Sequence, residues 1–231
     1  QAGQRFFIDR LAHDNDVYWR LIDPFGRAVN APVQMGSDIG EITLGVNGSY
    51  TLLIEGRAYT SGNASYEFSV TLLEDGPAWP MALGEVVAGR IATAGARATH
   101  TFSLDSARQL LFDSLTNNNR ISWSLARADG SVLASRSFQQ SDSWGADVNP
   151  LLFLAAGDYR LTIDADGDVT GDYRLRLLDL GEATAYTPGA AVDGVLGQVG
   201  VSAELPRDDG SAPAIETQLY RFVASAGERF Y

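Results

Sequence analysis

One heptapeptide occurs three times in the chain, and this internal repetition constrains the fold more than any other feature. Residues 1–7 read QAGQRFF, residues 106–112 read SARQLLF and residues 225–231 read SAGERFY. Further matched blocks follow the first two copies in the same order. The period of roughly 100–120 residues is too long for a solenoid repeat of ~20–50 residues and suits separately cored domains. The sequence therefore predicts an array of domains.

The segments that precede these blocks repeat as well. Residues 85–91 resemble residues 190–196, and residues 99–102 resemble residues 219–222. We therefore expect three parts, and we expect the chain to be a piece of a longer protein. They are residues 1–75, a repeat that lacks its first strands; residues 83–180, a complete repeat; and residues 181–231, the opening strands of a further repeat.

Short alternating segments bounded by turn residues indicate an all-β fold. Apolar and polar residues alternate around Trp19 and around Trp123, and Gly, Asn, Asp and Pro separate the segments, which is the pattern of strands. Several such strands per repeat predict a β-sandwich. We expect the two tryptophans to anchor the cores, the alternative being an exposed sugar-stacking role. Tyr50 and Tyr159 follow Gly turns and are expected to hold loops through their hydroxyls, as in a tyrosine corner.

Composition excludes several functional classes. The 231 residues carry a formal charge of −12, which argues against nucleic acid and anionic lipid as partners. The chain contains no cysteine, so disulfides and thiolate metal sites are excluded. The sequence has no run of apolar residues long enough to predict insertion into a membrane. The composition is otherwise that of an ordinary globular protein.

Four blocks carry a resemblance to a known class of protein. They are residues 19–26 (WRLIDPFG), 48–52 (GSYTL), 170–180 (TGDYRLRLLDL) and 219–229 (LYRFVASAGER). These blocks resemble the tandem repeats of giant bacterial exoproteins and adhesins and, more distantly, the bacterial pre-peptidase C-terminal domain. The resemblance implies tandem jelly-roll-like antiparallel β-sandwiches in a secreted or surface-anchored stalk or adhesin. It also implies occasional Ca²⁺ binding and no catalysis in these domains.

An acidic loop is the most chemical-looking stretch. Asp164, Asp166, Asp168 and Asp172 alternate around glycines, and such a loop can wrap a Ca²⁺ ion, which takes six to eight oxygen ligands. The alternative is an acidic hairpin turn. The equivalent loop of the first repeat, residues 55–63, lacks most of these acids. We therefore expect no cofactor to be required for folding, with Ca²⁺ as the one candidate ion.

Two tryptophans have no counterpart in the other repeat. Trp79 lies between Pro77 and Pro80 at the boundary of two repeats, and we expect it to pack the interdomain joint. Trp144 lies in an insertion of the second repeat, residues 139–149. It is the candidate contact residue for a glycan or another protein.

Catalysis has no support in the sequence, and we expect no enzyme activity. His13 and His100 fall at unrelated positions, and none of the common catalytic motifs is present. The leading hypothesis is a structural module of a long secreted or cell-surface bacterial fibre, stalk or adhesin. Its partners would be neighbouring repeats of the same protein, including a homopolymer joined by strand addition. The alternatives are a module that binds a glycan or a surface receptor, and an accessory domain of an extracellular enzyme.

Overall fold

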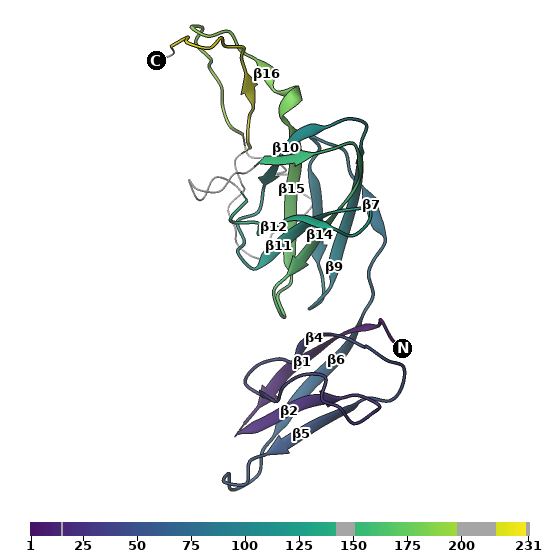
Figure 1. The fold of residues 1–231 in the computed structure, drawn as a ribbon. Coiled ribbons are helices and arrows are strands. Elements are labelled where there is room, and N and C mark those ends of the chain that lie inside the picture. The colour runs from purple at the N-terminus through teal and green to yellow at the C-terminus, as the bar shows by residue number, and fades with distance from the viewer. Residues whose placement is uncertain (15, 142–150, 198–215, 230–231) are drawn as a thin grey trace. The chain divides into compact units, whose positions relative to one another are not determined.

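The computed structural model describes residues 1–14, 16–141, 151–197 and 216–229. Among these residues there are strands, turns and one short 3-10 helix, η1 (Leu180–Glu182), so the all-β prediction is confirmed. No helix in these ranges is long and apolar enough to cross a membrane. The chain divides into two compact units (Figure 1). The first contains Gln1–Asp75, Ala92–Ala96 and Ala165–Thr170, and the second contains Gly76–Ile91, Arg97–Asp164 and Gly171–Tyr231.

The first unit consists of two three-stranded antiparallel sheets, with strand orders β4-β1-β6 and β3-β2-β5. Residues 17–22 alternate strictly between the buried face and the more exposed face of β2, as a half-buried strand requires. The strands are β1 (Arg5–His13), β2 (Val17–Ile22), β3 (Val33–Gln34), β4 (Gly40–Thr43), β5 (Thr51–Gly56) and β6 (Tyr66–Leu73).

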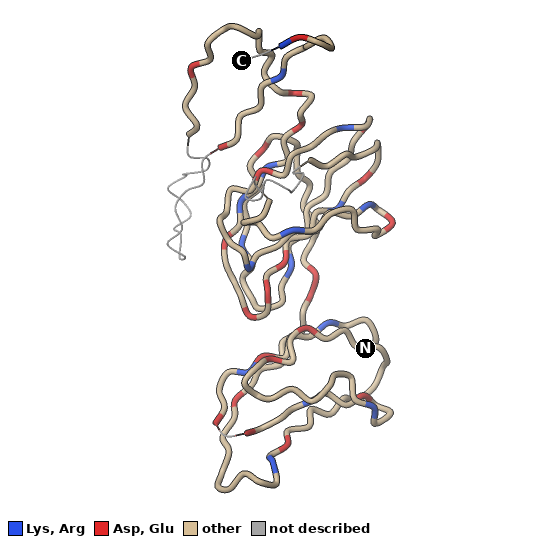
Figure 2. The backbone as a smooth tube through the Cα atoms, turned by 60° about the vertical axis from the view of Figure 1, so that its left-hand side comes forward, with Lys and Arg blue, Asp and Glu red and all other residues tan. Residues whose placement is uncertain are grey.

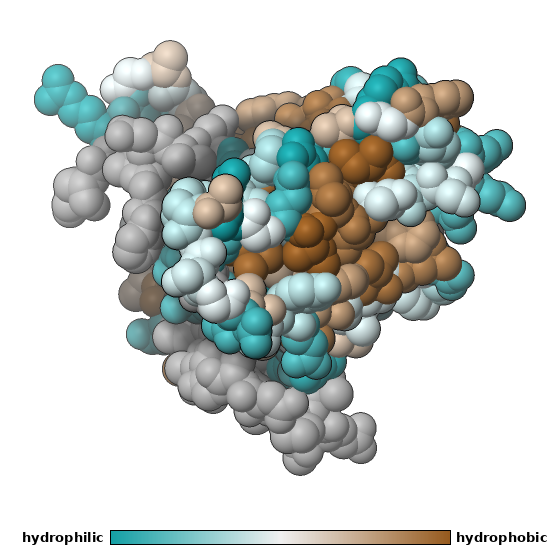
Figure 3. Space-filling model, turned by 90° about the horizontal axis from the view of Figure 1, so that it is seen from below, coloured by the Kyte–Doolittle hydropathy of each residue, from teal (hydrophilic) through white to brown (hydrophobic). Residues whose placement is uncertain are grey.

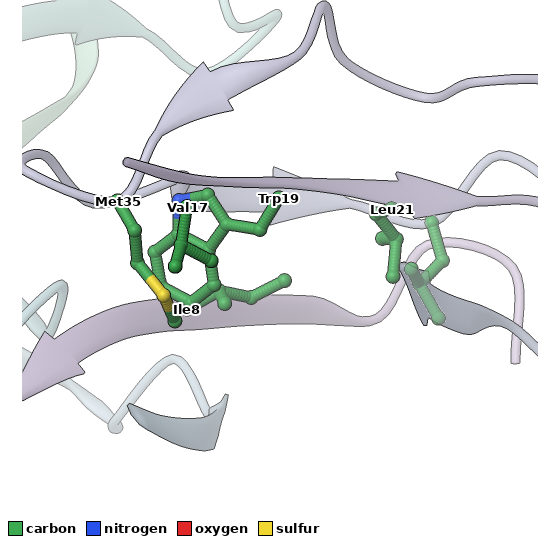
Figure 4. Packing of buried hydrophobic residues seen from close by; sticks show 6 residues of the cluster. Ile8, Val17, Trp19, Leu21 and Met35 are labelled. Atoms are coloured by element: carbon green, nitrogen blue, oxygen red, sulfur yellow. The ribbon is translucent and has the colours of Figure 1, made fainter. Parts of the chain in front are cut away.

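Trp19 is the centre of the first core. It is fully buried, and its ring meets the Phe68 ring of the facing sheet edge-on, with 6.0 Å between centroids. Its Nε1–H donates to the Ser37 carbonyl over 3.2 Å, which satisfies the polar end of the indole. Figure 4 shows Trp19 beside Met35, with Ile8 on the opposite strand.

The second unit has two larger sheets, with strand orders β13-β10-β15-β8 and β12-β11-β14-β9-β7. Strands β8 to β15 follow the order of an eight-stranded jelly roll, and β7 adds a parallel edge strand next to β9. The strands are β7 (Ala78–Pro80), β8 (Val87–Ile91), β9 (Arg97–Leu104), β10 (Arg108–Ser114), β11 (Ile121–Arg127), β12 (Val132–Ser137), β13 (Leu151–Leu154), β14 (Gly157–Ala165) and β15 (Gly171–Asp179). Strand β7 precedes the boundary expected at residue 83.

Trp123 occupies the place of Trp19 in the second core. It is buried, stacks on Phe112 with 4.3 Å between ring centroids, and donates from Nε1 to Ser141 Oγ over 2.6 Å. The prediction that Trp19 and Trp123 are core anchors is therefore confirmed for both units.

A tyrosine holds the same turn in each unit. The Tyr50 hydroxyl donates to the Val46 carbonyl over 3.0 Å, and the Tyr159 hydroxyl donates to the Ala155 carbonyl over 2.8 Å. Both bonds reach back four residues, so the expected tyrosine corners are confirmed.

Strands β1 to β6 of the first unit correspond in order and pairing to β10 to β15 of the second unit. Among the described residues, the first unit has no counterpart of β8 or β9, so β5 and β6 are sheet edges. The C-terminal segment contains β16 (Thr184–Ala185) and β17 (Tyr220–Arg221), which pair in parallel as β7 and β9 do.

Candidate functional site

The described ranges contain no group of three or more His, Asp or Glu side chains that could hold a metal ion. Figure 2 shows acidic and basic residues scattered along both units, without a large cluster of one sign.

The acidic loop does not form a ligand cluster. Asp164 pairs with Arg97 at 2.7 Å, and Asp172 pairs with Arg90 at 3.2 Å, each directly across a strand ladder. Asp166 and Asp168 lie in the turn between β14 and β15. This arrangement favours the acidic-turn alternative, because two of the four carboxylates already have arginine partners. Ca²⁺ binding stays a prediction, which melting curves with and without Ca²⁺ after chelation would test.

The two unmatched tryptophans differ in what the structure describes. Trp144 lies outside the described residues. Trp79 is in β7, directly opposite His100 of β9, with 6.0 Å between ring centroids, and it remains about half exposed. Its predicted role in the interdomain joint stays a prediction.

His100 and Tyr173 form a buried polar pair where β8 and β9 close the second sandwich. His100 Nε2 lies 2.9 Å from the Tyr173 hydroxyl, beside a cavity of about 450 Å³ that Trp79 also lines. Burial lowers the pKa of His100 and raises the pKa of Tyr173 to about 12. Gly89 of β8 lies against the same hydroxyl, since a Cβ there would stand 2.3 Å from it.

The lowered pKa of His100 predicts acid sensitivity of the second unit. Below the ordinary pKa of 6.5, the unfolded chain takes up a proton that folded His100 does not, so stability falls as the pH decreases towards the folded pKa. The slope is at most ~1.4 kcal/mol per pH unit. Denaturant unfolding between about pH 7.5 and 5.5 should show this loss in wild type. His100→Gln should remove it and His13→Gln should retain it, whereas equal slopes in wild type and His100→Gln would contradict the prediction.

The first unit is uncovered on the side where β8 and β9 close the second. Val70 is 51% exposed whereas its counterpart Leu177 is 0% exposed, and Tyr66 is 49% exposed whereas its counterpart Tyr173 is 2% exposed. We call this surface the open side, and define it by Phe6, Tyr50, Leu52, Tyr66 and Val70.

The open side is hollow and apolar. A cavity of about 400 Å³ lies there, lined mainly by apolar side chains of the two sheets. Figure 3, seen from below the view of Figure 1, shows apolar side chains exposed over a continuous area. Edge strands with unpaired backbone groups beside an apolar surface are a typical site for strand addition.

The C-terminal segment carries side chains that match this surface. Residues 190–196 and 219–222 repeat the sequences around β8 and β9. Phe222 is 50% exposed, whereas its counterpart Phe102 in β9 is 6% exposed and stacks on Tyr159 with 5.3 Å between ring centroids. Leu196 is 54% exposed, whereas its counterpart Ile91 in β8 is 1% exposed. The chain therefore contains both an unfilled sandwich edge and two segments, residues 190–196 and 219–222, whose sequences resemble the strands that fill such an edge. In the structure, residues 220–221 of these segments form a strand, β17.

Sequence reasoning predicted strand addition between neighbouring units but named no residue of the open side as a site residue. It aligned Tyr66 with Tyr173, and residues 190–196 with residues 85–91, but it had no measure of exposure. The available signal was the absence of the two opening strands from residues 1–75, which leaves the partners of those strands uncovered.

No family model and no curated protein matches the chain. Among solved structures, it is similar to the pre-peptidase C-terminal domain of a collagenase from Bacillus anthracis, at 17% identity and a TM-score of 0.38, over 45% of this chain and 97% of that one. It is also similar to the CUB1-EGF-CUB2 region of human MASP-1/3, at 9% identity and a TM-score of 0.30, over 77% of this chain and 89% of that one. The β-sandwich assignment rests on the strand pairing described above.

Proposed function

We propose that the chain is a non-catalytic structural repeat module, in which the strand pair that precedes a unit along the array completes that unit's sandwich. The observation that carries the proposal is the match between the open side of the first unit and residues 190–196 and 219–222. In the second unit, the equivalent strands β8 and β9 pair with β15 and β14.

A comparison of what the two units share and where they differ supports a structural role. Their buried tryptophans and tyrosine corners coincide, whereas the acidic loop of the second unit keeps only one acidic counterpart, Glu55, in the first. Packing is thus the property that the units share. Neighbouring repeats of the same protein are the proposed partners. The proposed location, secreted or on a bacterial cell surface, and the stalk or adhesin role rest on the sequence resemblance.

A chain of two joined copies tests completion within one molecule. Residue 231 of the first copy is followed directly by Ile8 of the second, because residues 225–231 and 1–7 are copies of one segment. Residues 190–222 of the first copy then precede the first unit of the second copy in natural register. We expect the open first unit to unfold at a lower temperature than a completed one, because completion buries its apolar edge. The joined chain has two first units and completes one of them. Calorimetry should therefore show that the enthalpy of the low-temperature transition, per gram of protein, falls by about half.

The control is a joined chain in which Ala183 of the first copy is followed directly by Gln1 of the second, so that it lacks β16 and residues 190–222 between the two copies. It should retain the full low-temperature transition. If both joined chains melted alike, the proposed completion would be wrong.

A further inference from the structure

Gly194 in the C-terminal segment points to a specific contact with Tyr66. Its counterpart Gly89 has no room for a Cβ because the Tyr173 hydroxyl occupies that place. Gly194 has only ordinary contacts, the nearest being Gln218 Oε1 at 3.5 Å, and its φ is not in the left-handed region. A larger residue therefore fits at this position in the free chain. If a tyrosine packed against residue 194 as Tyr173 packs against Gly89, residue 194 would have to be glycine. The counterpart of Tyr173 is the half-exposed Tyr66.

The second segment, residues 219–222, also has a residue that matches the open side. Phe102 of β9 lies directly opposite Tyr159 in the β9–β14 ladder. The counterparts of these residues are Phe222 and Tyr50, and Tyr50 lines the cavity of the open side. The same register places Tyr220 opposite Leu52, as His100 lies opposite Leu161.

Both surfaces belong to one chain, so two copies can supply them to each other. We propose that the open side of the first unit binds residues 190–196 and 219–222 of a second copy, with Gly194 against Tyr66 and Phe222 against Tyr50. This inference rests on the proposed function and extends the same closure to separate molecules. The contact joins unlike surfaces head to tail, so repeated association gives open chains of molecules.

Two variants with complementary defects test the contact. Gly194→Leu blocks the donor strand and leaves the open side intact, whereas Val70→Asp charges the open side and leaves the donor intact. Each change should weaken self-association by about tenfold or more, through overpacking and through burial of an unpaired charge. Sedimentation velocity of wild type should show a series of oligomers that grows with concentration. Each variant alone should be monomeric under the same conditions.

The equimolar mixture decides the question. Only one working junction exists between the two variants, so the mixture should form 1:1 dimers that do not grow further. Formation of the dimer also requires that each variant be folded in its intact part. Tyr66→Asp serves as a second open-side variant should Val70→Asp fail to fold.

Matched controls change neighbouring residues that face away from the contact. Val195→Leu adds bulk beside Gly194, at a position whose counterpart Arg90 is exposed, and Thr71→Asp adds charge beside Val70. Both controls should keep the wild-type oligomers. A mixture that stays monomeric would overturn association between copies, and the proposed function would stand if the joined chain were still completed. Variants that associate as readily as wild type would also overturn the proposed contact between copies, because another surface would then be responsible for the association.

Discussion

Trp123→Ala should lower the free energy of unfolding of the second unit by ~3–5 kcal/mol, the usual cost of removing a buried aromatic side chain. The indole is 1% exposed and stacks on Phe112, which in turn meets Phe138 edge-on at 5.6 Å between ring centroids. The substitution also removes the donor that Ser141 Oγ accepts from. Trp19→Ala should have the same effect on the first unit, where Trp19 is 0% exposed.

The two substitutions should act on separate transitions. Each unit has its own buried tryptophan between its own sheets, so loss of one core leaves the other in place. Calorimetry of the full chain should show one transition lowered and the other retained in each variant. Trp79→Ala is the control, because Trp79 is 47% exposed and should change stability by much less. A common shift of both transitions in either core variant would show that the units do not fold independently.

Arg176→Ala should destabilise the second unit by ~3–5 kcal/mol, because it leaves a buried carboxylate without its partner. Arg176 Nε donates to Asp113 Oδ2 over 2.8 Å, and the Asp113 side chain is 1% exposed. Thr217 Oγ1 donates to the other oxygen, Asp113 Oδ1, over 2.7 Å, so the pair also fastens the C-terminal segment to the body of the unit.

Removing both charges separates the cost of an unpaired charge from the value of the pair. Asp113→Leu combined with Arg176→Met should recover most of the loss, since a buried ion pair contributes little net stability over apolar residues of similar size. Chemical denaturation measures the free energy of unfolding of wild type, of Arg176→Ala and of the double variant. Arg90→Ala breaks the more exposed pair with Asp172 and should cost no more than ~1 kcal/mol. A double variant as unstable as Arg176→Ala would show that lost packing, and not the unpaired charge, causes the effect.

The fold class and the core anchors could be predicted from the sequence because they depend on local pattern. Alternation with a period of two places Trp19 and Trp123 on the inner face of a strand, whatever the neighbouring strands are. The Gly-x-Tyr segments fix a turn and a strand start, and Tyr50 and Tyr159 form their hydrogen bonds only four residues away. Comparison of the two units within one chain also indicated which segments the first unit lacks.

The candidate site depends on pairing between residues that are far apart in the sequence. The four aspartates of the acidic loop looked alike in the sequence, but the β9–β14 and β8–β15 ladders place arginines opposite Asp164 and Asp172. Trp79 was expected only to lie at the boundary of two repeats, and the structure places it in the parallel edge strand β7, opposite His100. Parallel pairing of this kind leaves no local signal in the sequence.

The sequence by itself determined the strands, the turns, the inward-facing residues and the resemblance between segments, because each follows from residue order and side-chain type. Only the tertiary structure decided which of those inward-facing residues are covered. Val70 of β6 and Leu177 of β15 occupy the same position on corresponding strands, yet Val70 is half exposed and Leu177 fully buried. The difference arises because the cover of a strand face is supplied by other strands. β8 and β9 supply it in the second unit, and the residues that the structure describes include no such strands in the first.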